Sequence, residues 1–166
     1  MSARTVSVKV ASVRVLSAFL LAAAVLAAGA PGAVAQTGAG YRVVAARTGF
    51  AGIEARLNAA IAKHGMIAVT RASASDGAAG RGLSIRGDVV IGVFRNDVAI
   101  RMLAANLDAG IEAPVRFHLV EEAGGGASIR FHLPSVVFGR YEGEAIKALG
   151  RELDPIFEAI ARDAAD

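Results

Sequence analysis

The tripeptide Phe-His-Leu occurs twice in a short stretch of the chain, and its histidines are the side chains best suited to chemistry. Phe117–Leu119 and Phe131–Leu133 flank three consecutive glycines, a pattern that predicts two strands joined by a hairpin loop. If the turn is centred on Gly125, His118 lies opposite His132. Opposed side chains on such a pair lie about 5 Å apart, so two imidazoles could share a metal ion or an anion.

Alternation along the two strands sorts their side chains onto two faces. The phenylalanines and leucines of both tripeptides share one face, which we expect to pack in the core. The other face carries the candidate ligand-binding residues Arg116, His118, Arg130 and His132. No third metal ligand is evident, so a metal ion would depend on the two histidines. A solvated polar face without a ligand is the alternative interpretation.

No catalytic motif accompanies these residues. Gly82–Gly87 contains a serine but is one residue too long for a nucleophile elbow, so no catalytic residue is assigned. The glycines fit neither a dinucleotide-binding fingerprint nor a P-loop, so we expect no cofactor. Glu121 and Glu122 are expected to be solvated at the hairpin tip. His64 is expected to cap the end of a helix, where a cation complements the dipole.

The elements that must position these side chains follow from hydrophobic periodicity and turn residues. Strands are predicted at residues 41–48, 66–72, 88–94, 115–121 and 128–133, with the apolar strand 88–94 at the centre of the sheet. Helices are predicted from 48 or 49 to 65, from 96 or 97 to between 106 and 110, and from 142 to about 164. Pro155 is expected to kink the last helix or to restart it with Asp154 as N-cap.

The resulting order is β-α-β-β-α-β-β-α. Hairpins require antiparallel pairing, and each amphipathic helix needs a sheet face to cover. We therefore expect an α+β fold, a two-layer α/β sandwich with a mainly antiparallel sheet and helices on one face. The apolar stripes of the first helix (Ile53, Leu57, Ile61) and the last (Leu149, Leu153, Ile160) should be buried against that sheet.

The amino-terminal segment has the features of a signal peptide. Arg4, Lys9 and Arg14 form a basic region, Val15–Ala28 is apolar, and Ala33–Ala35 offers small residues for cleavage before Gln36. Residues 1–35 are therefore assigned as a signal peptide, 36–40 as a flexible leader and 41–166 as a single domain. This predicts a periplasmic or secreted protein. The apolar run is too short for a stable membrane span, although an uncleaved segment could still anchor the chain.

Composition excludes several classes of function. The three basic residues of the signal peptide account for the excess of 18 Lys and Arg over 15 Asp and Glu, so the remaining chain is formally neutral. The basic pI therefore gives no reason to expect a nucleic-acid partner. The absence of cysteine excludes disulfides, thiol nucleophiles, iron–sulfur clusters and thiolate zinc sites.

The order of elements and turns resembles the domain-of-unknown-function 302 family over nearly all of the mature chain. The family's Phe-Gly-Asn-Pro turn is Phe94–Asp97 here, in which only Phe94 and Asn96 fit, and its Leu-Pro is Ala113-Pro114. Asn96 is therefore a fifth candidate ligand-binding residue. The family's acidic and histidine-bearing loop start has no counterpart in residues 73–80.

The resemblance implies a small α/β domain, often dimeric, with no established activity. Some family members are associated with sulfur-oxidation systems, but a chain without cysteine has no thiol on which to carry a sulfur atom.

Three functions remain open from the sequence. The first is an exported module that binds a small ligand or a protein partner without catalysing a reaction. The second is a structural or assembly protein that acts through its sheet edges, with a homodimer as the simplest assembly. The third is an enzyme that uses His118 or His132 as acid–base and Arg116 or Arg130 to stabilise an oxyanion.

Overall fold

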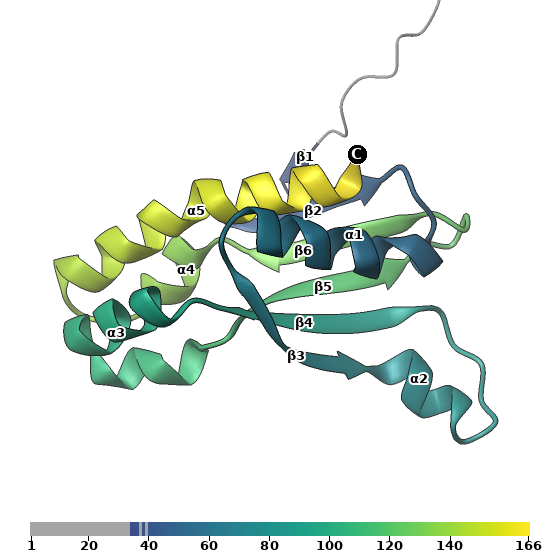
Figure 1. Ribbon diagram of the computed structural model, residues 1–166, viewed down its shortest axis with the longest axis horizontal. Helices are drawn as coiled ribbons and strands as arrows, with labels where there is room; N and C mark the ends of the chain where they lie inside the picture. The colour runs from purple at the N-terminus through teal and green to yellow at the C-terminus, as the bar shows by residue number, and fades with distance from the viewer. Residues whose placement is uncertain (1–33, 37, 39) are drawn as a thin grey trace, which may run out of the picture.

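One antiparallel sheet organises the chain, in a computed structural model that describes residues 34–36, 38 and 40–166. The strands lie in the order β1-β2-β6-β5-β4-β3, and every neighbouring pair is antiparallel (Figure 1). In chain order they are β1 (Val34–Gln36), β2 (Tyr41–Ala46), β3 (Ile67–Ser73), β4 (Asp88–Phe94), β5 (Val115–Glu121) and β6 (Ala127–His132).

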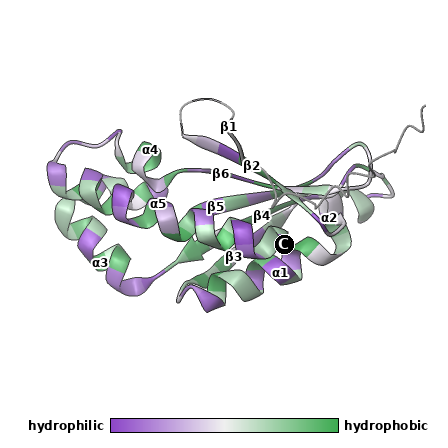
Figure 2. Ribbon diagram, turned by 90° about the horizontal axis from the view of Figure 1, so that it is seen from above, coloured by the Kyte–Doolittle hydropathy of each residue, from purple (hydrophilic) through white to green (hydrophobic). Residues whose placement is uncertain are grey.

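Two long helices cover one face of this sheet and leave the other face open (Figures 1 and 2). They are α1 (Phe50–Lys63) and α5 (Glu144–Ala165). The shorter helices are α2 (Ala74–Ala79), α3 (Asn96–Ala105), the 3-10 helix η1 (Leu107–Glu112) and α4 (Pro134–Phe138). No helix within the described residues is long and apolar enough to cross a bilayer.

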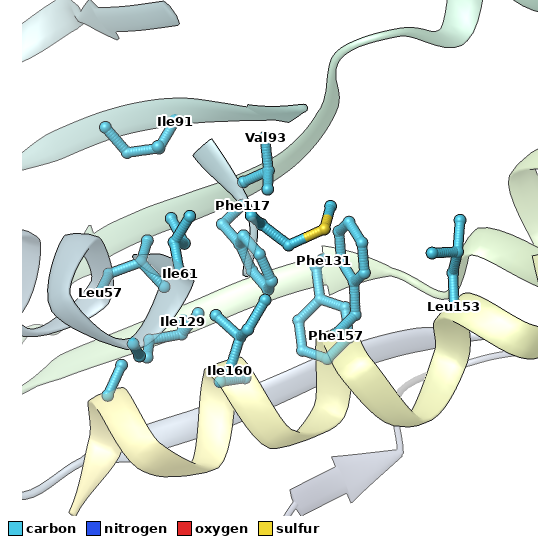
Figure 3. Close-up of a cluster of buried hydrophobic side chains, with 14 of the residues drawn as sticks. Leu57, Ile61, Ile91, Val93, Phe117, Ile129, Phe131, Leu153, Phe157 and Ile160 are labelled. Atoms are coloured by element: carbon cyan, nitrogen blue, oxygen red, sulfur yellow. The ribbon is translucent and has the colours of Figure 1, made fainter. Parts of the chain in front are cut away.

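The core lies between the sheet and the two long helices (Figure 3). Phe117 of β5 stacks on Phe157 of α5 with ring centroids 5.0 Å apart, and Phe131 of β6 lies 5.1 Å from Phe117. The predicted stripes are buried as expected: Ile53, Leu57, Ile61, Leu149, Leu153 and Ile160. Burial of each such side chain contributes about 1.5–3 kcal/mol, so these stripes fix the helices on the sheet.

The α+β prediction is confirmed, with differences at the ends of elements. α1 ends at Lys63 with His64 as its C-cap, and Gly65 follows with a φ of +70°, the left-handed conformation expected of a glycine that closes a helix. The stretch after β6, predicted as a connection, contains α4. Strand β4 has the predicted bounds, but it lies next to the edge strand β3 instead of at the centre of the sheet.

Of the two alternatives expected at Pro155, a kink or a restart of the helix, the restart was wrong. α5 runs as one helix from Glu144 to Ala165 with Pro155 inside it. The carboxylate of Asp154 does not cap a new helix, because its Oδ1 accepts a hydrogen bond from the Ser135 backbone N–H of α4 at 2.8 Å. A continuous apolar stripe on both sides of the proline keeps the two halves on one core surface, which outweighs the lost backbone bond.

The predicted signal peptide, residues 1–35, lies outside the described residues except for Val34 and Ala35. With Gln36 these two residues form β1, which pairs with Arg42–Val44 of β2. The predicted cleavage site therefore falls inside a strand of this structure. The flexible leader expected at 36–40 begins in that strand.

Candidate functional site

The face of the sheet that no helix covers carries the polar side chains of its central strands. Successive side chains of a strand point to opposite faces, so burial of Phe117, Leu119 and Phe131 places their neighbours on the open face. Arg116, His118, Arg130 and His132 are all exposed or half-buried there. The predicted division of the hairpin into a core face and a polar face is thus what the structure has.

The predicted register of the hairpin was wrong by two residues. Phe117 pairs with Phe131, and His118 pairs with Arg130 instead of with His132. The loop closes one residue earlier than expected, with Glu122 and Gly126 joined by a backbone hydrogen bond of 2.9 Å. His132 is consequently diagonal to His118, roughly 7 Å away at Cβ. A shift by two residues keeps each side chain on its face, which is why the face assignment survived.

His118 finds its partner on the next strand along the sheet. Its Nε2 lies 2.6 Å from Oδ2 of Asp88, the first residue of β4. Both side chains are about one-third exposed. An ionised carboxylate only accepts hydrogen bonds, so the bonded nitrogen of His118 carries a proton. The pair holds the imidazole in one orientation on the open face.

Arg130 is also held by a carboxylate. Its Nη2 donates to Oε1 of Glu122 at 2.7 Å and its Nε donates to the Ser128 hydroxyl at 3.0 Å. Ser128 in turn donates to the same Glu122 oxygen at 2.5 Å. The Ser128 and Arg130 hydrogen bonds lower the pKa of Glu122, and Glu122 raises the pKa of Arg130. Glu122 and Arg130 therefore stay charged and paired.

The remaining two candidates, His132 and Arg116, have no carboxylate partner among the described residues. The His132 ring lies against Tyr41 of β2, with ring centroids 5.1 Å apart and planes at 51°. Arg116 makes no ion pair and no side-chain hydrogen bond within the described part of the chain. Among the described residues, the Arg116 guanidinium and the His132 imidazole are therefore the two of the four groups that make no hydrogen bond, and only the guanidinium carries a permanent charge.

A hollow of about 360 Å³ lies on this face, and we call it the open-face hollow. All four predicted residues line it, together with Tyr41, Val90, Glu112, Val115, Phe131 and Val137. Its volume is at the lower end of the range for small-molecule sites, about 300–1,000 Å³. Guanidinium and imidazole groups beside apolar walls can bind the acid group of a small organic molecule.

Glu112, at the end of η1, adds a negative charge to the same hollow. Its Oε1 accepts a hydrogen bond from the Tyr141 hydroxyl at 2.8 Å. That bond to the carboxylate raises the pKa of Tyr141, so the tyrosine stays neutral and leaves the charge of Glu112 uncompensated.

Asn96 is not brought to this hollow. It is the first residue of α3, exposed, and Arg95 occupies the N-cap position that Asn96 or Asp97 was expected to fill. The Asp97 carboxylate instead accepts a hydrogen bond from Nε of Arg95 at 2.8 Å. Among the residues that the structure describes, no group of three or more metal-ligating side chains is close enough to hold a metal ion.

Sequence reasoning missed the roles of five residues in or near the hollow. Glu122 was expected to be solvated, and so was Glu121, whose Oε2 accepts a hydrogen bond from the Gly87 backbone at 2.7 Å. Asp88 was not considered. It is the one polar residue of the otherwise apolar strand β4, and its position in the alternation of that strand places it on the open face. Tyr41 and Glu112 lie far away in sequence, so only the tertiary fold could bring them in.

Comparisons with known proteins agree with the fold. A family model described as a domain of unknown function, DUF302, matches residues 41–160. The crystal structure of an uncharacterized conserved protein DUF302 from Bacillus stearothermophilus is similar with a TM-score of 0.70 and 21% sequence identity. The match covers 78% of this chain and 100% of that one. No curated protein matches the sequence.

Proposed function

The chain belongs to the DUF302 family of domains of unknown function, and we propose that it is an exported module that binds a small organic acid in the open-face hollow. The proposal concerns binding without a chemical step. The observation that carries it is Arg116, a guanidinium without an ion pair among the described residues, on the wall of a hollow of small-molecule size. Guanidinium groups bind carboxylates through two parallel hydrogen bonds.

The ion pairs and hydrogen bonds of the other polar groups support a ligand-binding site in preference to a solvated polar face without a ligand. Asp88 and Glu122 orient His118 and Arg130 before any ligand arrives. Orientation in advance lowers the entropic cost of binding. Apolar walls from Val90 and Val137 would accept the hydrocarbon part of an acid.

The proposal is tested by titration of the mature chain with short carboxylates, and two-dimensional NMR of the backbone amides monitors the binding. We expect the largest shifts in β5 and β6 around Arg116, and at least tenfold weaker binding in Arg116→Gln. Arg81→Gln, in the turn after α2, is the matched control and should bind normally. Uniform small shifts with every carboxylate, unchanged by Arg116→Gln, would contradict the proposal.

Export is the second part of the proposal and has its own test. The basic region, apolar run and small-residue site of the first 35 residues support cleavage before Gln36. Mass analysis of the amino terminus in envelope or culture fractions should find Gln36 or its cyclised form. A cytoplasmic protein that begins at Met1 or Ser2 would be inconsistent with export.

Assembly through a sheet edge is the second candidate, and it is favoured by β3. Every residue from Ile67 to Ala72 is exposed, Ile67 by 59% and Val69 by 47%. An exposed apolar edge strand can pair with a strand of another chain. Sedimentation at micromolar concentration should show a dimer that Val69→Lys disrupts, and a monomer at all concentrations would refute this candidate.

A further inference from the structure

Two opposite charges on the walls of the open-face hollow are not neutralised by other described residues. Arg116 has no ion pair there, and Glu112 is bonded to the neutral Tyr141 hydroxyl. The other polar groups of the lining already have partners: Arg130 is paired with Glu122, and His118 is hydrogen-bonded to Asp88. The His132 ring lies against Tyr41. A ligand therefore meets one free positive and one free negative group.

This arrangement discriminates between classes of ligand. A simple carboxylate satisfies Arg116 but brings a second negative charge toward Glu112. An amine has the converse problem, because it satisfies Glu112 and is repelled by Arg116. A molecule with both an ammonium and a carboxylate group satisfies both residues, and complementary charge of this kind is a main source of specificity.

The apolar walls of the hollow indicate that the uncharged part of the ligand is a hydrocarbon. Val90, which lies opposite His118, and Val137 line the hollow and offer no charge. Their surfaces would bury a hydrocarbon side chain, with a gain that grows with the apolar area covered. A volume of about 360 Å³ suits a ligand of amino-acid size better than a nucleotide or an oligosaccharide.

We propose that the open-face hollow binds a free α-amino acid with an apolar side chain, its carboxylate on Arg116 and its ammonium group on Glu112. This inference rests on the proposed binding function and names the ligand class. Arg130 and His118, already paired, shape the hollow and do not anchor the acid group.

Three probes of equal apolar size separate the contributions. Leucine carries both charges, 4-methylpentanoate lacks the ammonium group, and 3-methylbutylamine lacks the carboxylate. Isothermal calorimetry with the mature chain should give leucine a dissociation constant at least tenfold lower than that of either analogue. Binding of 4-methylpentanoate as tightly as leucine would overturn this inference and leave organic-acid binding intact.

Two variants test the assigned contacts. Glu112→Gln keeps an acceptor for the Tyr141 hydroxyl and should remove the preference for leucine over 4-methylpentanoate. Arg116→Gln should remove the preference for leucine over 3-methylbutylamine. Glu142→Gln and Arg81→Gln, two exposed residues outside the hollow, are the matched controls. Circular dichroism checks that each variant is folded.

The remaining outcomes also decide the question. A leucine preference that survives Glu112→Gln would show that the ammonium group is held elsewhere and would overturn the assignment. If none of the three probes binds, the amino-acid inference fails, and the carboxylate titration judges the wider binding proposal independently.

Discussion

The imidazole of His118 is joined to the carboxylate of Asp88, 30 residues earlier in the chain, with Nε2 2.6 Å from Oδ2. The two residues lie on neighbouring strands, His118 opposite Val90 and Asp88 opposite Val120. Both are on the open face, so their bond ties β4 to β5 beside the hollow. It also fixes which ring nitrogen is engaged and leaves the other for a ligand or for water.

Removal of this carboxylate should release the His118 ring. In Asp88→Ala we expect the Nε2 proton of His118 to exchange faster with water, because its acceptor is lost. The cost in stability should be only about 0.2–1 kcal/mol, as for other partly exposed pairs. Nitrogen NMR of the imidazoles provides the measurement and His132 the internal control. Unaltered exchange at His118 would argue against the bond.

Truncation of Leu153 should show that α5 is packed as described. This side chain is 1% exposed, so Leu153→Ala should lower the free energy of unfolding by about 2–5 kcal/mol. Ile100, on α3, is 60% exposed, and Ile100→Ala should change stability by less than about 0.5 kcal/mol. Denaturant unfolding compares the two, and equal costs would show that the α5 stripe is not in the core.

Two glycine substitutions should have opposite effects although both lie in helices. A Cβ on Gly150 of α5 would lie 2.7 Å from the Ser135 Cα and 2.9 Å from the Pro134 carbonyl oxygen. Gly150→Ala should therefore cost about 1–3 kcal/mol, despite the higher helix propensity of alanine. Gly77→Ala in α2 meets nothing within 4 Å and should be neutral or stabilising. Thermal unfolding of both variants checks the contrast.

Acid should weaken the contact between the end of α1 and α5. Hydrogen bonds from Lys63 and then His64 lower the pKa of Asp163, so the folded chain takes up this proton less readily than the unfolded chain. The stabilisation is present above the unfolded pKa of about 3.9 and is lost as pH falls through the lower folded value.

The substitution Asp163→Asn makes this pH dependence measurable. The difference in free energy of unfolding between parent and variant should shrink as pH falls below about 4. Urea unfolding at several pH values between 7 and 3 gives the measurement. A difference that stays constant across that range would mean that the ion pair does not contribute.

The helix stripes and the two faces of the hairpin could be predicted from the sequence because both follow from local periodicity. Leu153 and Phe157 repeat at helical spacing, and Phe117 alternates with His118 at strand spacing. Such patterns determine which side chains are buried together, whatever the details of the loops. The core was therefore predicted correctly even where element ends were not.

The register and the partners of the site residues could not be predicted in this way. Consecutive glycines allow several turn geometries, so the loop left open whether His118 faced His132 or Arg130. The bond to Asp88 depends on β4 lying beside β5, and the entry of Glu112 and Tyr41 depends on distant elements meeting at the hollow. Local sequence patterns do not indicate which distant elements become neighbours in the fold.

Strand β1 gives export a structural consequence. Cleavage before Gln36 would remove Val34 and Ala35, whose backbones pair with Val44 and Val43 of β2. The precursor would protect this margin of the sheet with its own leader, and the processed protein would expose it. Maturation would thus move the edge opposite β3 from β1 to β2, and the backbone groups of β2 that had paired with Val34 and Ala35 would first become available outside the cytoplasm.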